Sequence, residues 1–138
     1  MARAATKRIM SIGLSVGARL PAFCTSMGRV LLAALPEEEA RARIQASPRR
    51  TLTGKTVTDI DQIMELLAAA RTEGHAIVDQ ELEIGLTSIA VPVIDARGRT
   101  LAAINIGTQA TRFPPDLLAR DLLPKLKAAQ AELSRIVG

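Results

Sequence analysis

Residues 24–28 combine the groups with which a protein holds a small anion. The run Cys-Thr-Ser-Met-Gly supplies two hydroxyls, a glycine and the backbone N–H groups that open a helix. Because those N–H groups have no partner inside the helix, and because the helix dipole is positive there, a carboxylate is favoured at this position. Arg19 lies shortly upstream and is a candidate counter-ion. The sequence therefore predicts a carboxylate at the N-terminus of a helix that begins near Thr25.

Cys24 and His75 are the single cysteine and the single histidine, and they are the side chains that suggest nucleophilic catalysis. A thiol that precedes a helix has a lowered pKa, and a thiolate beside an imidazole is a nucleophile. No motif around either residue supports such a pair. We favour the interpretation that Cys24 is a small buried hydrophobe and that His75 is a partly exposed residue at the start of a strand. One cysteine and one histidine supply neither a disulfide nor a zinc site, and we expect no metal and no cofactor.

Other polar side chains fall on predicted strands. Asp79, Glu81 and Glu83 alternate, so on a strand they would share one face, where a solvated surface is a commoner explanation than acid–base catalysis. Ser88, Asn105 and Thr108 stand among apolar neighbours. A largely apolar pocket with a few converging polar groups is what a small carboxylate ligand needs.

The helices and strands that position these groups are predicted from the spacing of apolar residues and from the glycines and prolines that end each segment. Alternating apolar residues predict a strand over 9–16, and helical spacing predicts helices over 25–35, 37–46 and, after an approximate capping box from Thr58 to Asp61, up to Gly74. Strands are expected over 75–81, 89–94 and 101–106, the last two forming a hairpin. Pro92 should lie at an edge or face no partner. A helix from Pro115 to about 137 should be kinked or interrupted at Pro124.

This order predicts an α+β fold, an antiparallel sheet with flanking helices. The pattern is compatible with a sheet truncated at its N-terminal side. We assign residues 1–8 to a linker or a truncated strand and residues 9–138 to a single domain.

Composition and net charge argue against a nucleic-acid-binding protein and against a membrane-spanning protein. The chain has 138 residues, a net charge of +4 and a pI near 10.0, yet aromatic residues are only 1% of it, which excludes a stacking platform for single-stranded nucleic acid. The basic residues are scattered, and we interpret them as a solvated surface rather than a DNA footprint. No apolar run is long enough to span a membrane, and the single cysteine suits a reducing cytoplasm.

Several segments resemble the effector-binding domain of IclR-type bacterial transcription regulators. The resemblance covers roughly residue 9 to the C-terminus and is carried by residues 14–33, 74–85, 89–93, Gly98 and 102–105. The segment Cys-Thr-Ser-Met-Gly-Arg at 24–29 is most similar to the sequences of the branch that controls aromatic-acid catabolism through the β-ketoadipate pathway.

The resemblance implies a GAF-like (profilin-like) fold, in which the concave side of a curved antiparallel sheet is closed by loops and by the helix after Thr25. It implies a sensor that binds a small organic acid. The implied pocket is lined by Ile12, Leu20, Thr25, Ser26, Met27, Asp79, Leu86, Ser88, Asn105 and Gly107. Asn105 and Gly107 depart from the serines of relatives, which leaves the ligand open.

The resemblance also implies a homodimer or homotetramer whose rearrangement transmits ligand binding. The family's winged helix-turn-helix has no counterpart in these residues, so we expect DNA to be contacted only through a domain absent from this chain. Two alternatives stay open: an oligomerisation module with a vestigial pocket, and a GAF-like enzyme that uses Cys24.

Overall fold

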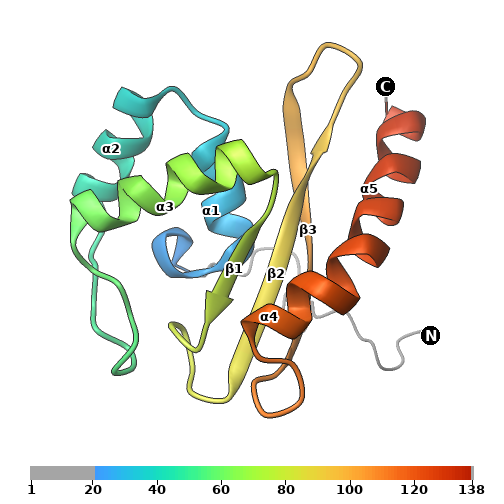
Figure 1. The fold of residues 1–138 in the computed structure, drawn as a ribbon. Helices are drawn as coiled ribbons and strands as arrows, with labels where there is room; N and C mark the ends of the chain where they lie inside the picture. Colours follow the sequence, from blue (N-terminus) through green and yellow to red (C-terminus); the bar gives the residue numbers. More distant parts are fainter. Residues whose placement is uncertain (1–20, 138) are drawn as a thin grey trace.

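The computed structural model describes residues 21–137, in which helices cover a small antiparallel sheet (Figure 1). In chain order the elements are η1 (Ala22–Cys24), α1 (Ser26–Ala33), α2 (Glu37–Ala46), α3 (Ile60–Glu73), β1 (Ala76–Asp79), β2 (Leu86–Ile94), β3 (Thr100–Gln109), α4 (Pro115–Leu117), the π-helical turn η2 (Leu118–Leu122) and α5 (Leu123–Val137). The strand predicted over 9–16, the linker predicted over 1–8, and Ile12, Arg19 and Leu20 lie outside the described residues.

The sheet separates two apolar clusters. Its strand order is β1-β2-β3, with both pairs antiparallel. On one face, Ala76 and Ala90 pack with buried side chains of α1, α2 and α3; on the other, Ile89 and Val91 pack with Leu118 and with residues of α5. Figure 1 shows the same layers, with α1 and α3 on one side of the strands and α4 and α5 on the other. The α+β class with an antiparallel sheet is confirmed.

The helix boundaries follow local chemistry. The Thr25 side chain caps α1, and α3 ends at Gly74, which takes the left-handed conformation at φ 81° that glycine adopts without strain. The sequence predicts Thr58 as the N-cap of α3, and this prediction is wrong by one residue. Ile60 packs against the helical cluster as the first residue of α3, so the N-cap falls on Asp59, whose carboxylate accepts from the Gln62 N–H at 3.0 Å.

The first strand is shorter than the sequence pattern predicts. β1 ends at Asp79 because Gln80 adopts φ 60°, a left-handed conformation that ends the pleat. Glu81 and Glu83 therefore lie in the turn between β1 and β2 and do not continue the strand face of Asp79. The expectation that the three carboxylates share one face is wrong.

Pro92 lies on the central strand at a point where one side has no paired strand among residues 21–137. β2 pairs with β3 along its length but with β1 only as far as Ala90. The Pro92 carbonyl accepts from the Gln130 side-chain amide at 2.7 Å, and the Ile94 N–H donates to the Ser134 hydroxyl at 3.4 Å. Side chains of α5 thus satisfy the part of β2 that β1 leaves uncovered, and the position expected for Pro92 is confirmed.

The C-terminal helix is interrupted just before Pro124, as expected. A proline has no N–H to donate to the carbonyl four residues earlier, which here is that of Arg120. The chain instead makes the wider turn η2, in which the Leu123 N–H bonds to the carbonyl of Leu118. Beyond it α5 runs as regular helix to Val137.

Candidate functional site

The first turn of α1 is tightly packed against η1. The Thr25 hydroxyl accepts from the Gly28 N–H at 3.2 Å and donates to the Pro21 carbonyl at 3.0 Å. A Cβ at Gly28 would lie 2.4 Å from the carbonyl oxygen of Ala22, so no side chain fits there. Thr25 is therefore engaged in building the helix N-terminus that the sequence predicted as an anion site.

Ser26, the first residue of α1, carries a polar group that the fold leaves unused. The residue is 1% exposed, and its hydroxyl oxygen is buried with no hydrogen-bond partner among the described residues. Leaving such a group unpaired costs about 1–3 kcal/mol, so buried hydroxyls normally have partners. At a helix N-terminus this hydroxyl and the adjacent backbone N–H groups are suited to a ligand oxygen.

The register of the sheet brings other predicted residues onto the face that α1 covers. Ser88 is opposite Gly107, and Asn105 is opposite Ala90, which packs in the helical cluster with residues of α1. Because alternate residues of a strand share a face, Leu86 lies on that face as well. Met27 is partly buried against the same cluster. The structure thus gathers these residues on the α1 side of the sheet.

Asp79 lies on the opposite face of the pleat. Its strand partner is Thr87, which in turn is paired with Thr108. The Asp79 carboxylate lies 3.4 Å from the Lys55 ammonium and accepts from the Gln80 side-chain amide at 3.1 Å. The register therefore separates Asp79 and Thr108 from Ser88 and its neighbours.

A buried ion pair lies next to this site and was not predicted from the sequence. Arg29 is 2% exposed and Glu81 7%, and the guanidinium binds both carboxylate oxygens, with Nη1 2.9 Å from Oε2. Arg29 also donates through Nε to the Phe23 carbonyl at 2.9 Å, and Glu81 accepts from the Val57 N–H at 3.1 Å. The partners are 52 residues apart, and no local signal distinguishes them from solvated charges.

Cys24 is fully buried, and burial raises the pKa of its thiol from 9.0 to about 11; nearby Arg29 lowers it and Glu81 raises it by smaller amounts. The lowered pKa expected for a thiol before a helix is wrong, because desolvation by burial is the largest effect on this thiol and raises its pKa. The interpretation of Cys24 as a buried hydrophobe is confirmed.

His75 lies between α3 and β1, with its side chain 16% exposed and its Nε2 3.9 Å from a Glu73 carboxylate oxygen. Its Nδ1 is buried without a hydrogen-bond partner in the described part of the chain. No group of three or more His, Cys, Asp or Glu side chains in residues 21–137 is arranged to hold a metal ion. None of the described helices is long and apolar enough to cross a membrane.

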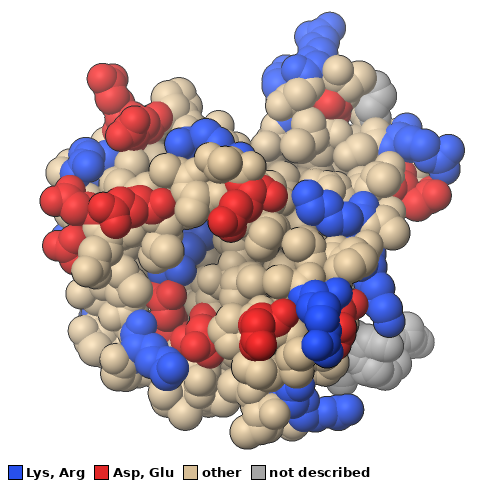
Figure 2. Space-filling model, in the orientation of Figure 1, with Lys and Arg blue, Asp and Glu red and all other residues tan. Residues whose placement is uncertain are grey.

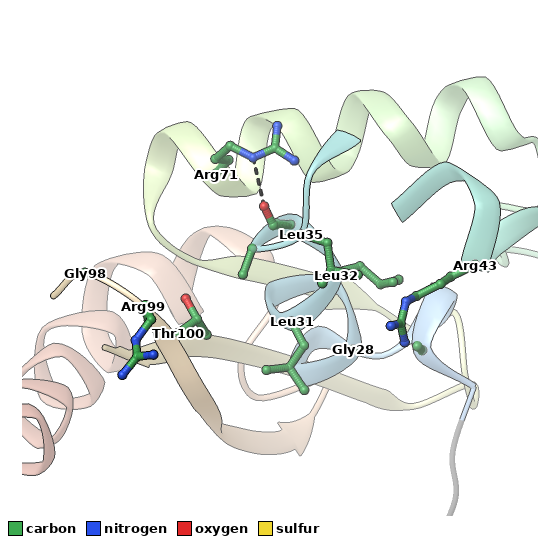
Figure 3. Close-up of a pocket in the computed structure, with 12 residues that line it drawn as sticks. Gly28, Leu31, Leu32, Leu35, Arg43, Arg71, Gly98, Arg99 and Thr100 are labelled. Carbon is green, nitrogen blue, oxygen red and sulfur yellow. Dashed lines mark hydrogen bonds between the residues drawn. The ribbon is translucent and has the colours of Figure 1, made fainter. Parts of the chain in front are cut away.

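A separate open cavity of about 790 Å³ runs along α1 toward its C-terminal end (Figure 3). Leu31, Leu32 and Leu35 line it, and Arg43, Arg71 and Arg99 come to it from α2, α3 and the β2–β3 hairpin. None of the described residues predicted for the pocket is among its lining residues. Ala22 and Gly28 also line it, so the cavity extends from the first turn of α1, but its lining residues differ from those of the predicted pocket.

The sequence of this chain is similar to those of bacterial transcriptional regulators. The family description "Bacterial transcriptional regulator IclR C-terminal" matches residues 1–135. The Pca regulon regulatory protein of Pseudomonas putida is 44% identical over 134 residues, which cover 96% of this chain and 46% of that protein. The p-hydroxybenzoate hydroxylase transcriptional activator of Acinetobacter baylyi is 38% identical over 130 residues, covering 94% of this chain and 48% of the activator. The chain thus spans about half the length of these curated relatives.

Solved structures of transcriptional regulators are also similar to this chain. A putative transcriptional regulator of Rhodococcus sp. RHA1, RHA06195, has a TM-score of 0.85 and 43% identity, with 93% of this chain and 51% of that chain covered. The inducer-binding domain of the PobR transcription factor from Acinetobacter, a double mutant in complex with 3-hydroxybenzoic acid, has a TM-score of 0.81 and 39% identity, covering 86% of this chain and 69% of that chain.

Proposed function

Because the chain belongs to the IclR C-terminal family of bacterial transcriptional regulators, we propose that it senses a small organic acid, most specifically an aromatic acid or an intermediate of aromatic catabolism. Two similar proteins support the aromatic class by name: a p-hydroxybenzoate hydroxylase activator, and an inducer-binding domain solved with 3-hydroxybenzoic acid. The homologues are transcriptional regulators, and the buried thiol of Cys24 gives no support to the enzyme alternative.

The buried Ser26 hydroxyl, which has no hydrogen-bond partner within residues 21–137, is the observation that carries this proposal. A carboxylate at the N-terminus of α1 would accept from the Ser26 hydroxyl and from backbone N–H groups, with the helix dipole favouring the negative charge. The ligand body would lie against Met27 and the α1 side of the sheet. There Ser88 and Asn105 can bond a ring hydroxyl. The proposed pocket also includes Leu86 and Gly107, and keeps Ile12, Arg19 and Leu20 from the sequence prediction, with Thr25 as the helix cap. Asp79 is left out of it because the register places Asp79 on the opposite face of the sheet.

Transmission of the signal follows from differential binding. Ligand contacts at α1 and at the β2–β3 hairpin would stabilise one arrangement of a homodimer or homotetramer over another. We assign DNA contact to a winged helix-turn-helix outside these 138 residues, in keeping with relatives about twice this length.

Thermal unfolding in the presence of small acids tests the proposal. Benzoate, its hydroxy derivatives and aliphatic acids of similar size should be compared. An acid present at 100 times its Kd should add about 2.7 kcal/mol to the free energy of unfolding. A chain that no carboxylate stabilises would be an oligomerisation module rather than a sensor.

Replacing Ser26 with alanine tests the placement of the carboxylate. Ser26→Ala removes a buried hydroxyl that has no partner among residues 21–137, so the free energy of unfolding should stay unchanged or rise. Acid affinity measured by calorimetry should fall about tenfold or more, because a hydrogen bond to a charged group contributes about 1.5–3 kcal/mol. The control Thr25→Ala removes the helix cap and should cost about 1 kcal/mol of stability. Unchanged acid affinity in folded Ser26→Ala would place the carboxylate elsewhere.

A further inference from the structure

We propose that Arg29 and Glu81 are positioning residues that form the effector site before any ligand arrives. Their ion pair holds the first turn of α1 against the turn between β1 and β2. What the site binds rests on the proposed function, whereas the positioning is testable without a ligand.

Arg29 acts on the helix end that carries Ser26. Its Nε donates to the carbonyl of Phe23 in η1 at 2.9 Å, three residues before Ser26. Its other nitrogens bind both oxygens of Glu81. A planar guanidinium that makes these contacts together fixes direction as well as distance. The orientation of η1 and of the first turn of α1 is thereby tied to the position of Glu81.

Glu81 is itself held in place by the loop that precedes α3. Its Oε1 accepts from the Val57 N–H at 3.1 Å, and its carbonyl accepts from the Thr56 hydroxyl at 2.7 Å. The Thr53 hydroxyl donates to the neighbouring Gln80 carbonyl at 2.7 Å. Loop 53–57 therefore fixes the segment that carries Glu81.

The same turn leads directly into the predicted pocket strand. Gln80 has a strained φ of 60°, and its side-chain oxygen accepts from the Gly85 N–H at 3.0 Å, next to Leu86 at the start of β2. The ion pair thus links the two halves of the proposed site, the N-terminus of α1 and the start of β2.

Stability alone does not explain a buried ion pair. Two charges taken out of water lose hydration that their mutual attraction only partly restores, and an apolar pair of similar volume is often as stable or more stable. Removing one partner leaves an uncompensated buried charge, so single deletions confound folding with positioning. The informative change removes both charges together, as in Arg29→Met with Glu81→Leu.

Cys24 is a built-in reporter of this positioning. It is the single cysteine of the chain, it is fully buried, and it lies between Phe23 and α1. Arg29 lowers the pKa of its thiol and Glu81 raises it by a smaller amount, so removing both charges does not lower that pKa and does not by itself accelerate alkylation. Faster alkylation of Cys24 by iodoacetamide under native conditions therefore measures opening of the segment from η1 to α1.

We expect the double variant to fold, with Cys24 alkylated about tenfold faster or more than in the wild type. The apolar pair can preserve packing, but it cannot replace the directional hydrogen bonds that tie η1 and α1 to Glu81, so this segment opens locally more often. Its affinity for 3-hydroxybenzoate should fall about tenfold or more if that acid binds the wild type. Two controls should keep wild-type labelling: Arg43→Met, which breaks an exposed ion pair, and Leu126→Ala, which destabilises the opposite cluster.

A folded double variant with wild-type labelling of Cys24 would overturn the proposal. If the double variant does not fold, the alkylation rate of Cys24 in Arg29→Lys tests the positioning role instead. This variant keeps the charge but cannot reach Phe23 and both oxygens of Glu81 together, so labelling must still accelerate. A wild-type chain that binds no acid contradicts the proposed function, while labelling still decides the positioning role.

Discussion

At the residue scale, two of three polar side chains at the first turn of α1 have their hydrogen bonds satisfied within the fold, and the third does not. The Thr25 hydroxyl both donates and accepts within the helix cap. Arg29 directs its guanidinium into one carboxylate and one carbonyl. Ser26 is buried with neither kind of partner among the described residues. Since the fold builds Thr25 and Arg29 into itself, Ser26 is the side chain of this turn that a ligand can use.

The buried thiol of Cys24 predicts a pH dependence. Its pKa in the folded protein is raised to about 11, above the ordinary 9.0, because burial penalises the thiolate. The unfolded chain therefore releases the proton first. The contribution of this group to stability is complete below pH 9 and is lost as the pH rises to about 11. Denaturant unfolding of wild type and Cys24→Ala should show a steeper loss in the wild type across that interval, and parallel curves would contradict the raised pKa.

Gly28 and Gly54 form a matched pair for testing how tightly η1 packs on α1. A methyl group at Gly28 would overlap the backbone of Ala22, whereas one at Gly54 would meet open space. Gly28→Ala should therefore lower the free energy of unfolding by about 2 kcal/mol or more, as overpacking against backbone does. Gly54→Ala should change it by less than about 0.5 kcal/mol. Equal effects in thermal unfolding would mean that η1 yields easily.

At the scale of elements, the sequence predicts those boundaries that a local signal sets. The Thr25 cap, the left-handed Gly74 and Pro124 in the first turn of α5 each act on their own backbone, so the helices start and stop close to the expected residues. The end of β1 depends on Gln80 adopting a left-handed conformation that its type does not indicate. Hydrogen bonds with Thr53, 27 residues away, and with Gly85 at the far end of the turn hold that conformation, and the sequence pattern around Gln80 does not indicate them.

Helix α5 serves as an edge cover for β2, and this role is testable at Gln130. Gln130→Ala removes the donor to the Pro92 carbonyl and should cost about 1 kcal/mol of unfolding free energy. Exchange of the nearby Ile94 amide, which bonds to Ser134, should accelerate in hydrogen-exchange NMR. Glu132→Ala, on an exposed position of the same helix, is the control. Identical Ile94 exchange in the two variants would show that the edge does not depend on Gln130.

At the scale of the whole molecule, the residues of the proposed site come from elements distant in sequence. The candidates Ser26, Ser88 and Asn105 could be proposed from residue types, yet only the register of β2 with β3 puts Ser88 and Asn105 on the α1 side of the sheet. The same register separates Asp79 from them. The Arg29–Glu81 pair could not be predicted, because burial of a charge depends on a partner 52 residues away.

The surface of the whole molecule gives the last prediction, that this chain has no sequence-specific DNA binding despite a pI near 10.0. Lys and Arg side chains are interspersed with Asp and Glu over the face shown in Figure 2, and the described residues form no continuous basic stripe on that face. A recognition helix enters the major groove through its N-terminal residues. Here α2 begins with Glu37, Glu38 and Glu39, α3 has Asp59 and Asp61 at its start, and α1 is packed on the sheet.

Weak, salt-sensitive association with any duplex is therefore expected from net charge alone. In a competition gel shift at physiological salt, unlabelled random duplex should displace the chain as effectively as a candidate operator. A hundredfold preference for one sequence would correspond to about 2.7 kcal/mol of base discrimination. Such discrimination requires side chains that reach base edges from an element that fits the groove. Finding it would mean that these 138 residues read DNA themselves and are not only the sensing half of a regulator.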